Sequence, residues 1–144
     1  MRTLDHVAIA VPDLPEAIRR FAEDFGLTFA GTEAVEAART ETAFFPVSSP
    51  DQPTRIELVS PLRGEGPIAR QLATRGPGLH HLCFRTDSLD ADIERLRARG
   101  YAFTTDGPTP GAHGTRVIFV HPKSTGGVLV ELAEAPAAGA AHGH

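Results

Sequence analysis

The sequence predicts an α+β fold in which two tandem βαβββ modules form a curved mixed sheet, a cup with the helices outside. One observation is an internal repeat, because an offset of 75 residues aligns His6 with His81 and Leu14 with Leu89. The other is a change of hydrophobic period within each half, from the alternation of strands to the spacing of helices. A chain of 144 residues can bury a hydrophobic core. We therefore expect one domain over residues 1–134.

The first strand of each module carries a histidine on one face. Residues 5–11 alternate, so that His6 shares a face with Ala8 while the larger apolar side chains point the other way. Residues 80–86 repeat the pattern, with His81 in the place of His6. The repeat therefore predicts two histidines at equivalent positions of the fold.

A helix is expected after each of these strands. In the first module Asp13 can cap the helix, with Glu16 three residues later as in a capping box, and Gly26 ends it. In the second module apolar residues around Ile93 recur at helical spacing, and Gly100 ends the helix.

Three strand-like runs follow each helix. They cover about residues 27–33, 39–47 and 54–60 in the first module and about 101–105, 115–121 and 127–133 in the second. Module one thus spans about 4–62, a connecting helix about 67–75, and module two about 79–134. The tail, 135–144, has no periodicity and is expected to be flexible.

The composition excludes several classes of protein. A formal net charge of −4 argues against nucleic-acid binding, and no apolar run approaches the roughly 20 residues that span a bilayer. The N-terminal residues lack the apolar stretch of a signal peptide, so we expect a cytoplasmic protein. Cys83 is the only cysteine, which excludes an internal disulfide and a thiolate zinc site. A metal site here must therefore use histidine and carboxylate ligands.

Four polar residues lie within predicted strands at a repeated spacing. Glu57 follows His6 by 51 residues, and Glu131 follows His81 by 50. A carboxylate in an apolar strand is costly to bury unless it is paired, protonated or bound to a metal. Imidazole and carboxylate suit zinc, cobalt, nickel, manganese or iron at a site open to substrate. A metal centre with two ligands from each module is the favoured interpretation, and metal-free His–Glu pairing is the alternative.

Several stretches of the sequence are shared with a known family. They are residues 5–11, 56–62, 67–72, 78–82 and 121–132. Over residues 4–134 the chain resembles the methylmalonyl-CoA epimerases of the vicinal oxygen chelate superfamily, which also holds glyoxalases, bleomycin resistance proteins and dioxygenases. The segment 121–132 distinguishes the epimerases from glyoxalase I, whose final hairpin usually carries a different turn.

The resemblance implies a set of metal ligands and two catalytic groups. The ligands carry over onto His6, Glu57, His81 and Glu131, with Co²⁺ favoured over Zn²⁺, Mn²⁺ or Ni²⁺. Some family members have glutamine in place of Glu57. Glu131 and Glu41 would be the two acid/base groups that exchange the α-proton of methylmalonyl-CoA through an enolate.

The resemblance also implies an acyl-CoA substrate and a homodimer. Substrate contacts are expected from Lys123, Ser124, Gly126 and Gly127, which lie between the last two predicted strands. Arginine and lysine favour the phosphates of coenzyme A. Other cations that suit this role are Arg39, Arg63, Arg70 and Arg75. The sequence leaves methylmalonyl and ethylmalonyl substrates open.

Three other functions remain to be compared. A glyoxalase I-like lyase or isomerase acting on a thiol adduct could use the same four ligands. An extradiol dioxygenase needs only two histidines and one carboxylate, so Glu57 argues against it. A non-catalytic protein of the same fold that binds a small molecule often lacks metal ligands, and the complete set of four argues against that class.

Overall fold

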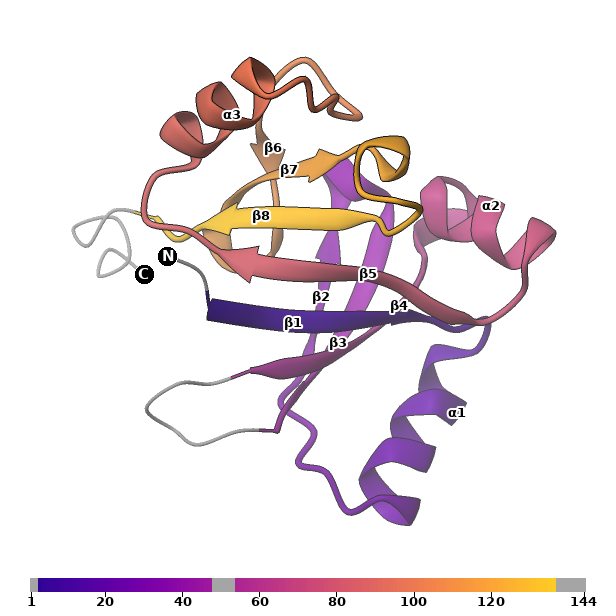
Figure 1. The fold of residues 1–144 in the computed structure, drawn as a ribbon. Coiled ribbons are helices and arrows are strands. Elements are labelled where there is room, and N and C mark those ends of the chain that lie inside the picture. Colours follow the sequence, from indigo (N-terminus) through magenta and orange to yellow (C-terminus); the bar gives the residue numbers. More distant parts are fainter. Residues whose placement is uncertain (1–2, 48–53, 137–144) are drawn as a thin grey trace.

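Eight strands form one curved mixed sheet in the computed structural model, which describes residues 3–47 and 54–136 (Figure 1). The strand order within that part of the chain is β2-β3-β4-β1-β5-β8-β7-β6. The strands are β1 (Thr3–Ala10), β2 (Thr32–Val35), β3 (Thr40–Pro46), β4 (Arg55–Pro61), β5 (Gly78–Arg85), β6 (Thr109–Pro110), β7 (Arg116–Val120) and β8 (Val130–Glu134).

The two halves of the sheet repeat one pairing scheme. At the centre β1 and β5 pair antiparallel, β1 pairs parallel with β4, and β5 pairs parallel with β8. Outside them β3 and β7 occupy equivalent antiparallel positions. This arrangement confirms the predicted α+β class and is consistent with tandem modules.

The helices cover the outside of each half and one end of the cup. They are α1 (Leu14–Arg19), which continues as the π-helical turn η1 (Arg20–Asp24), α2 (Pro67–Thr74) and α3 (Leu89–Ala98). The described residues also form short 3₁₀ turns, which are η2 (Glu36–Ala38), η3 (Leu62–Gly64), η4 (Ala112–Gly114) and η5 (Pro122–Ser124). Figure 1 shows α1 and α3 on opposite outer sides of the sheet, with α2 between β4 and β5 in the chain. No helix in the described ranges is long and apolar enough to cross a membrane.

Each outer helix covers its own apolar cluster. Under α1 the buried members are Val11, Leu14, Ala17, Ala43, Phe45 and Leu58. Under α3 they are Leu89, Ile93, Ile118 and Leu132. The cap of α1 is the predicted one, because the Asp13 side chain accepts a hydrogen bond from the Glu16 amide at 3.0 Å. Ile68 of α2 packs on the other face of the sheet, against Ala8 and Ala10.

The two edges of the sheet differ from prediction. The run 27–33 contributes only Thr32 and Glu33 to β2, because Gly31 has a φ of +107° and interrupts the extended backbone. The run 101–105 forms one isolated bridge, from Phe103 to Val120, and the edge strand is the two-residue β6 instead. Of the predicted tail, residues 137–144 lie outside the described part of the chain.

The sheet edges meet across the open side of the cup. The His113 amide of η4 donates to a carboxylate oxygen of Glu33 in β2 at 3.0 Å. The His113 ring also lies 4.4 Å from the ring of Phe44. These contacts join the edge of the sheet in module one to the edge in module two, so the curved sheet is nearly closed.

Candidate metal centre

A cavity of about 330 Å³ lies inside the curved sheet. Its wall includes residues of both modules, among them Thr42 and Val59 from the first and Val117 and Phe119 from the second. Arg70 of α2 also lines it. The volume is typical of a small-molecule site.

All four predicted ligands line this cavity from four adjacent strands. They are His6 in β1, Glu57 in β4, His81 in β5 and Glu131 in β8. Each strand presents alternate residues to the interior, which is why Leu58 beside Glu57 packs outward under α1 and Leu132 beside Glu131 packs outward under α3. The central pairing of β1 with β5 therefore brings two residues 75 apart in sequence into contact.

Three of the four side chains converge on one point. Nε2 of His6 lies 3.1 Å from Nε2 of His81 and 3.2 Å from Oε1 of Glu131, and His81 Nε2 lies 2.9 Å from the same oxygen. Donor atoms that surround an ion at about 2.1 Å and at right angles are about 3 Å apart. The spacing and the chemistry of His6, His81 and Glu131 thus fit a divalent metal ion.

Glu57 lies beside this group without joining it. Its Oε2 is 3.1 Å from Nδ1 of His6, on the other side of that ring, and accepts hydrogen bonds from Arg55 at 2.9 and 3.2 Å. Arg55 also donates to Asp5 at 2.8 Å. In this arrangement the guanidinium of Arg55 neutralises the negative charge of the Glu57 carboxylate. The role of Glu57 as a fourth ligand stays a prediction.

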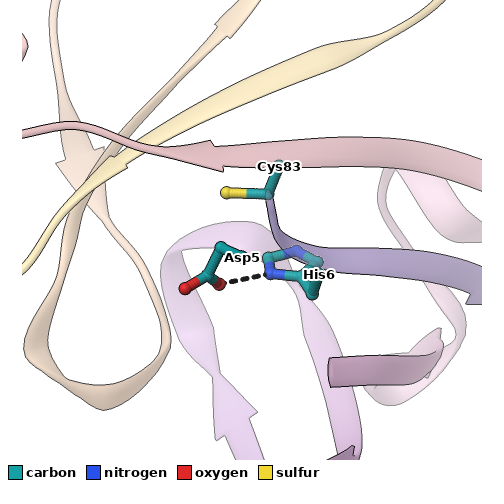
Figure 2. Close-up of side chains that lie close together, drawn as sticks. All are labelled: Asp5, His6 and Cys83. Atoms are coloured by element: carbon teal, nitrogen blue, oxygen red, sulfur yellow. Dashed lines mark hydrogen bonds and ion pairs between the residues drawn. The ribbon is translucent and has the colours of Figure 1, made fainter. Parts of the chain in front are cut away.

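Asp5 holds His6 from the side opposite Glu131. Figure 2 shows Asp5 and His6 on β1, with the 2.7 Å contact from His6 Nδ1 to the Asp5 carboxylate, and Cys83 on the neighbouring strand β5. Asp5, His6 and Cys83 are close enough to form a second three-ligand group. Arg55 and Arg85 already donate to the Asp5 oxygens, so the Asp5 carboxylate is engaged. Burial also raises the pKa of the Cys83 thiol. The group that contains Glu131 is therefore the better metal site.

The charges of the site keep Glu131 ionised. Its burial opposes ionisation, but hydrogen bonds from His6 and His81 outweigh this and lower its pKa to about 2. Burial likewise disfavours the charged form of His6. Its hydrogen bonds to Asp5 and Glu131 prevail and raise its pKa to about 9. In this arrangement His6 carries a proton at neutral pH, which an incoming cation would replace.

His81 has a polar partner and an aromatic one. Nδ1 of His81 lies 2.7 Å from Nδ1 of His80, and Phe119 meets the His81 ring edge-on with centroids 5.1 Å apart. Burial and the neighbouring charges of His81 and Arg75 lower the pKa of His80 to about 4. His80 is therefore a neutral imidazole at neutral pH.

The structure does not bring Glu41 to the cavity. On β3 the residues that line the cavity are Thr40 and Thr42, whereas Glu41 alternates with them and shares the face of Ala43 and Phe45. That face packs against the cluster under α1. The predicted role of Glu41 as a second acid/base group therefore gains no support from this geometry.

The predicted substrate loop also lies apart from the cavity wall. Lys123 and Ser124 belong to η5, and the Ser124 hydroxyl accepts a hydrogen bond from the Ala102 amide at 3.0 Å. Neither these residues nor Gly126 and Gly127 line the cavity. Their contacts with a substrate remain predictions.

Three polar neighbours of the ligands were not predicted as site residues. Asp5 and His80 each precede a histidine ligand and are themselves 75 residues apart, so the repeat contained a signal for both. Arg55 stands two residues before Glu57, on the same face of β4. A partly buried arginine beside a predicted ligand is a recognisable pattern once strand and face are known.

A comparison with known protein families identifies the superfamily of the chain. The model of the Glyoxalase/Bleomycin resistance protein/Dioxygenase superfamily matches residues 5–119. Together with the fold and the convergent His–His–Glu group, this match shows that the chain belongs to that superfamily.

Within the superfamily, the named relatives and solved structures are mainly methylmalonyl-CoA epimerases. The ethylmalonyl-CoA/methylmalonyl-CoA epimerase of Cereibacter sphaeroides is 39% identical over 131 residues, which cover 90% of this chain and 95% of the relative. The uncharacterized protein YqjC of Bacillus subtilis is 34% identical over 134 residues, which cover 93% of each chain.

Solved structures agree with this grouping. The methylmalonyl-CoA epimerase of Mycobacterium tuberculosis superposes with a TM-score of 0.88 at 36% identity, over 96% of this chain and 91% of that one. A methylmalonyl-CoA epimerase in complex with methylmalonyl-CoA and NH₄⁺ gives a TM-score of 0.88 at 31% identity, over 95% of this chain and 96% of that one.

Proposed function

We propose that the chain is a metal-dependent methylmalonyl-CoA epimerase, an isomerase that interconverts the R and S forms by removing and returning the α-proton. The observation that carries the proposal is the convergence of His6, His81 and Glu131 at the wall of the cavity inside the curved sheet. The relatives named as epimerases support the substrate, and the donor set supports a divalent ion, with Co²⁺ preferred and Zn²⁺, Mn²⁺ or Ni²⁺ also compatible.

Each residue of the site would contribute one donor atom to the ion. His6 and His81 present Nε2 atoms, and Glu131 presents Oε1, each from a different strand. Glu57 can add an oxygen if its carboxylate turns from Arg55. A bound divalent ion supplies positive charge that polarises carbonyl and carboxylate oxygens of a substrate.

Glu131 is the group best placed to move the proton. The Glu131 carboxylate stays ionised even well below neutral pH. Its side chain is buried in the protein and lines the cavity. A carboxylate that accepts a proton from the α-carbon must approach it to about 3 Å. Oε1 is the Glu131 oxygen that faces the two histidines.

The coenzyme A part of the substrate requires cations at the cavity. Of the cations considered from sequence, Arg70 on α2 lines the cavity, while Arg63 pairs with Glu36 and Arg75 donates to Gln71. Arg70 is therefore the first residue to test for contact with phosphate or carboxylate oxygens of the substrate.

The test is the exchange of the substrate α-proton with D₂O. We expect NMR of methylmalonyl-CoA to show exchange with the metal-loaded enzyme and its loss after chelation. Elemental analysis of the wild type beside His81→Ala should show metal in the wild type alone. No exchange by metal-loaded enzyme rejects the epimerase, and turnover of a hemithioacetal in a parallel assay would favour the glyoxalase I-like alternative.

A homodimer in the cytoplasm is part of the proposal. The exposed aromatic side chains Phe25 and Phe29, which are 65% and 42% exposed, are of the kind that protein interfaces cover. Light scattering coupled to gel filtration measures the mass directly, and a monomer at micromolar concentration would contradict the dimer.

A further inference from the structure

Two β-bulges interrupt the central pairing of β1 with β5. Along β1 the pairing passes from Leu4–Phe84 to His6–Cys83, which leaves Asp5 without an opposite residue. Along β5 it passes from Ala8–His81 to Ile9–Leu79, which leaves His80 without one. Asp5 and His80 are thus the extra residues of two bulges related by the internal repeat.

The bulges change the direction of these two side chains. In a regular strand the residue before a cavity-facing histidine points to the opposite face. A bulge re-aims a side chain locally, and here Asp5 and His6 both line the cavity, as do His80 and His81. Each histidine ligand therefore has its preceding residue beside it on the same face.

Both bulges are fixed from outside by side-chain hydrogen bonds to equivalent carbonyls. The Thr54 hydroxyl donates to the carbonyl of Leu4 at 2.9 Å, directly before Asp5. The Gln71 amide of α2 lies 3.3 Å from the carbonyl of Leu79, directly before His80. Leu4 and Leu79 are again 75 residues apart, so the duplicated fold repeats the support as well as the bulge.

Each re-aimed side chain contacts the Nδ1 atom of its neighbour. Asp5 meets Nδ1 of His6 at 2.7 Å, and His80 meets Nδ1 of His81 at 2.7 Å. A histidine that binds a metal through Nε2 must carry its proton on Nδ1, and a hydrogen-bond acceptor there fixes both tautomer and ring orientation. For His81, Nδ1 of His80 can serve as that acceptor when His80 carries its own proton on Nε2.

We infer that the two bulge residues, Asp5 and His80, are the positioning residues of the two histidine ligands, and that His80 holds His81 with Nε2 directed at the metal. This inference rests on the metal role in the proposed function. His80 is the sharper test, because Asp5 also accepts hydrogen bonds from Arg55 and Arg85, and its replacement would remove a carboxylate partner from both cations.

The experiment measures Zn²⁺ affinity by competition with a chelating dye for the wild type, His80→Ala and His80→Asn. We expect His80→Ala to bind about 10–100-fold more weakly, the usual loss when the partner of a ligand histidine is removed. His80→Asn should recover most of the affinity, because its amide oxygen can accept the Nδ1 proton. Leu79→Ala, at a neighbouring position that is 68% exposed, is the matched control and should bind as the wild type does.

A second measurement reads the tautomer itself. In ¹⁵N–¹H spectra of the Zn²⁺-loaded wild type, His81 should carry its proton on Nδ1 and His80 on Nε2. Equal affinity of His80→Ala and wild type, or a His80 protonated on Nδ1 in the loaded protein, would overturn the inference. Absence of Zn²⁺ binding by the wild type would instead reject the metal role on which it rests, so the two failures are distinguishable.

Discussion

At the scale of single residues, the charge of Glu131 decides what the site can do. Burial alone would favour its neutral form, yet two histidines hold it as a carboxylate with a pKa near 2. Glu41, the other predicted acid/base group, lies on the face of β3 that packs under α1. The two glutamates therefore differ in environment although the sequence suggested the same role.

Substituting each glutamate by glutamine separates these roles. We expect Glu131→Gln to lower the rate of α-proton exchange by roughly 10²–10⁴-fold, because an amide cannot accept the proton. Glu41→Gln should leave the rate near that of the wild type, since its side chain lies outside the cavity. NMR exchange rates at equal metal content provide the comparison, and a large loss in Glu41→Gln would restore its catalytic role.

The protonation of His6 predicts how stability depends on pH without metal. Its pKa is raised from 6.5 to about 9, so its contribution is complete below pH 6.5 and is lost as the pH rises through 9. Asp5 and Glu131, whose pKa values are lowered, stay ionised throughout this window.

We therefore expect the free energy of unfolding of the chelator-treated protein to fall between about pH 6.5 and 9. Urea unfolding at several pH values measures it. His6→Gln should show a flatter dependence, and a wild-type profile that rises across this window would contradict the assignment of the proton.

At the scale of elements, close packing around the edge strand β6 shapes the cavity wall. Gly111 lies between β6 and η4 and lines the cavity. A Cβ atom there would lie 2.6 Å from Cγ1 of Val117 and 2.7 Å from Oγ1 of Thr115. The φ of Gly111 is negative, so any residue could adopt its backbone conformation. Glycine is needed at this position because the side chains of Thr115 and Val117 lie so close.

Gly111→Ala should destabilise the protein by about 1–3 kcal/mol, the usual cost of overpacking. Gly107→Ala is the matched control, because no atom lies within 4 Å of a Cβ placed there and its φ is not in the left-handed region. Urea unfolding of both variants beside the wild type tests the difference. Equal stability of the two variants would show that β7 can move without cost.

At the scale of the whole molecule, the candidate metal centre formed by His6, His81 and Glu131 joins the two modules. Its converging ligands come from β1 in the first module and from β5 and β8 in the second. The contact of Glu33 with the His113 amide joins the two edges of the same sheet. An ion bound by these ligands would therefore stabilise the folded chain as one unit.

Metal should raise the melting temperature of the wild type. An ion at 100 times its dissociation constant adds about 2.7 kcal/mol of stability, which corresponds to roughly 5–10 °C for a chain of this size. Calorimetry with and without Co²⁺ measures the shift, and His81→Ala should show little of it. An equal shift in both proteins would place the bound ion elsewhere.

The sequence by itself determined the fold class, the duplication and the four polar residues in register, because period and repeat are local properties of the chain. It wrongly placed full strands over 27–33 and 101–105, where the structure has only the start of β2 and one isolated bridge. Only the tertiary structure decided which side chains meet. The face of Glu41, the ion pair of Glu57 with Arg55 and the bulges that turn Asp5 and His80 inward depend on the register between distant strands, and a shift of one residue moves a side chain to the other face.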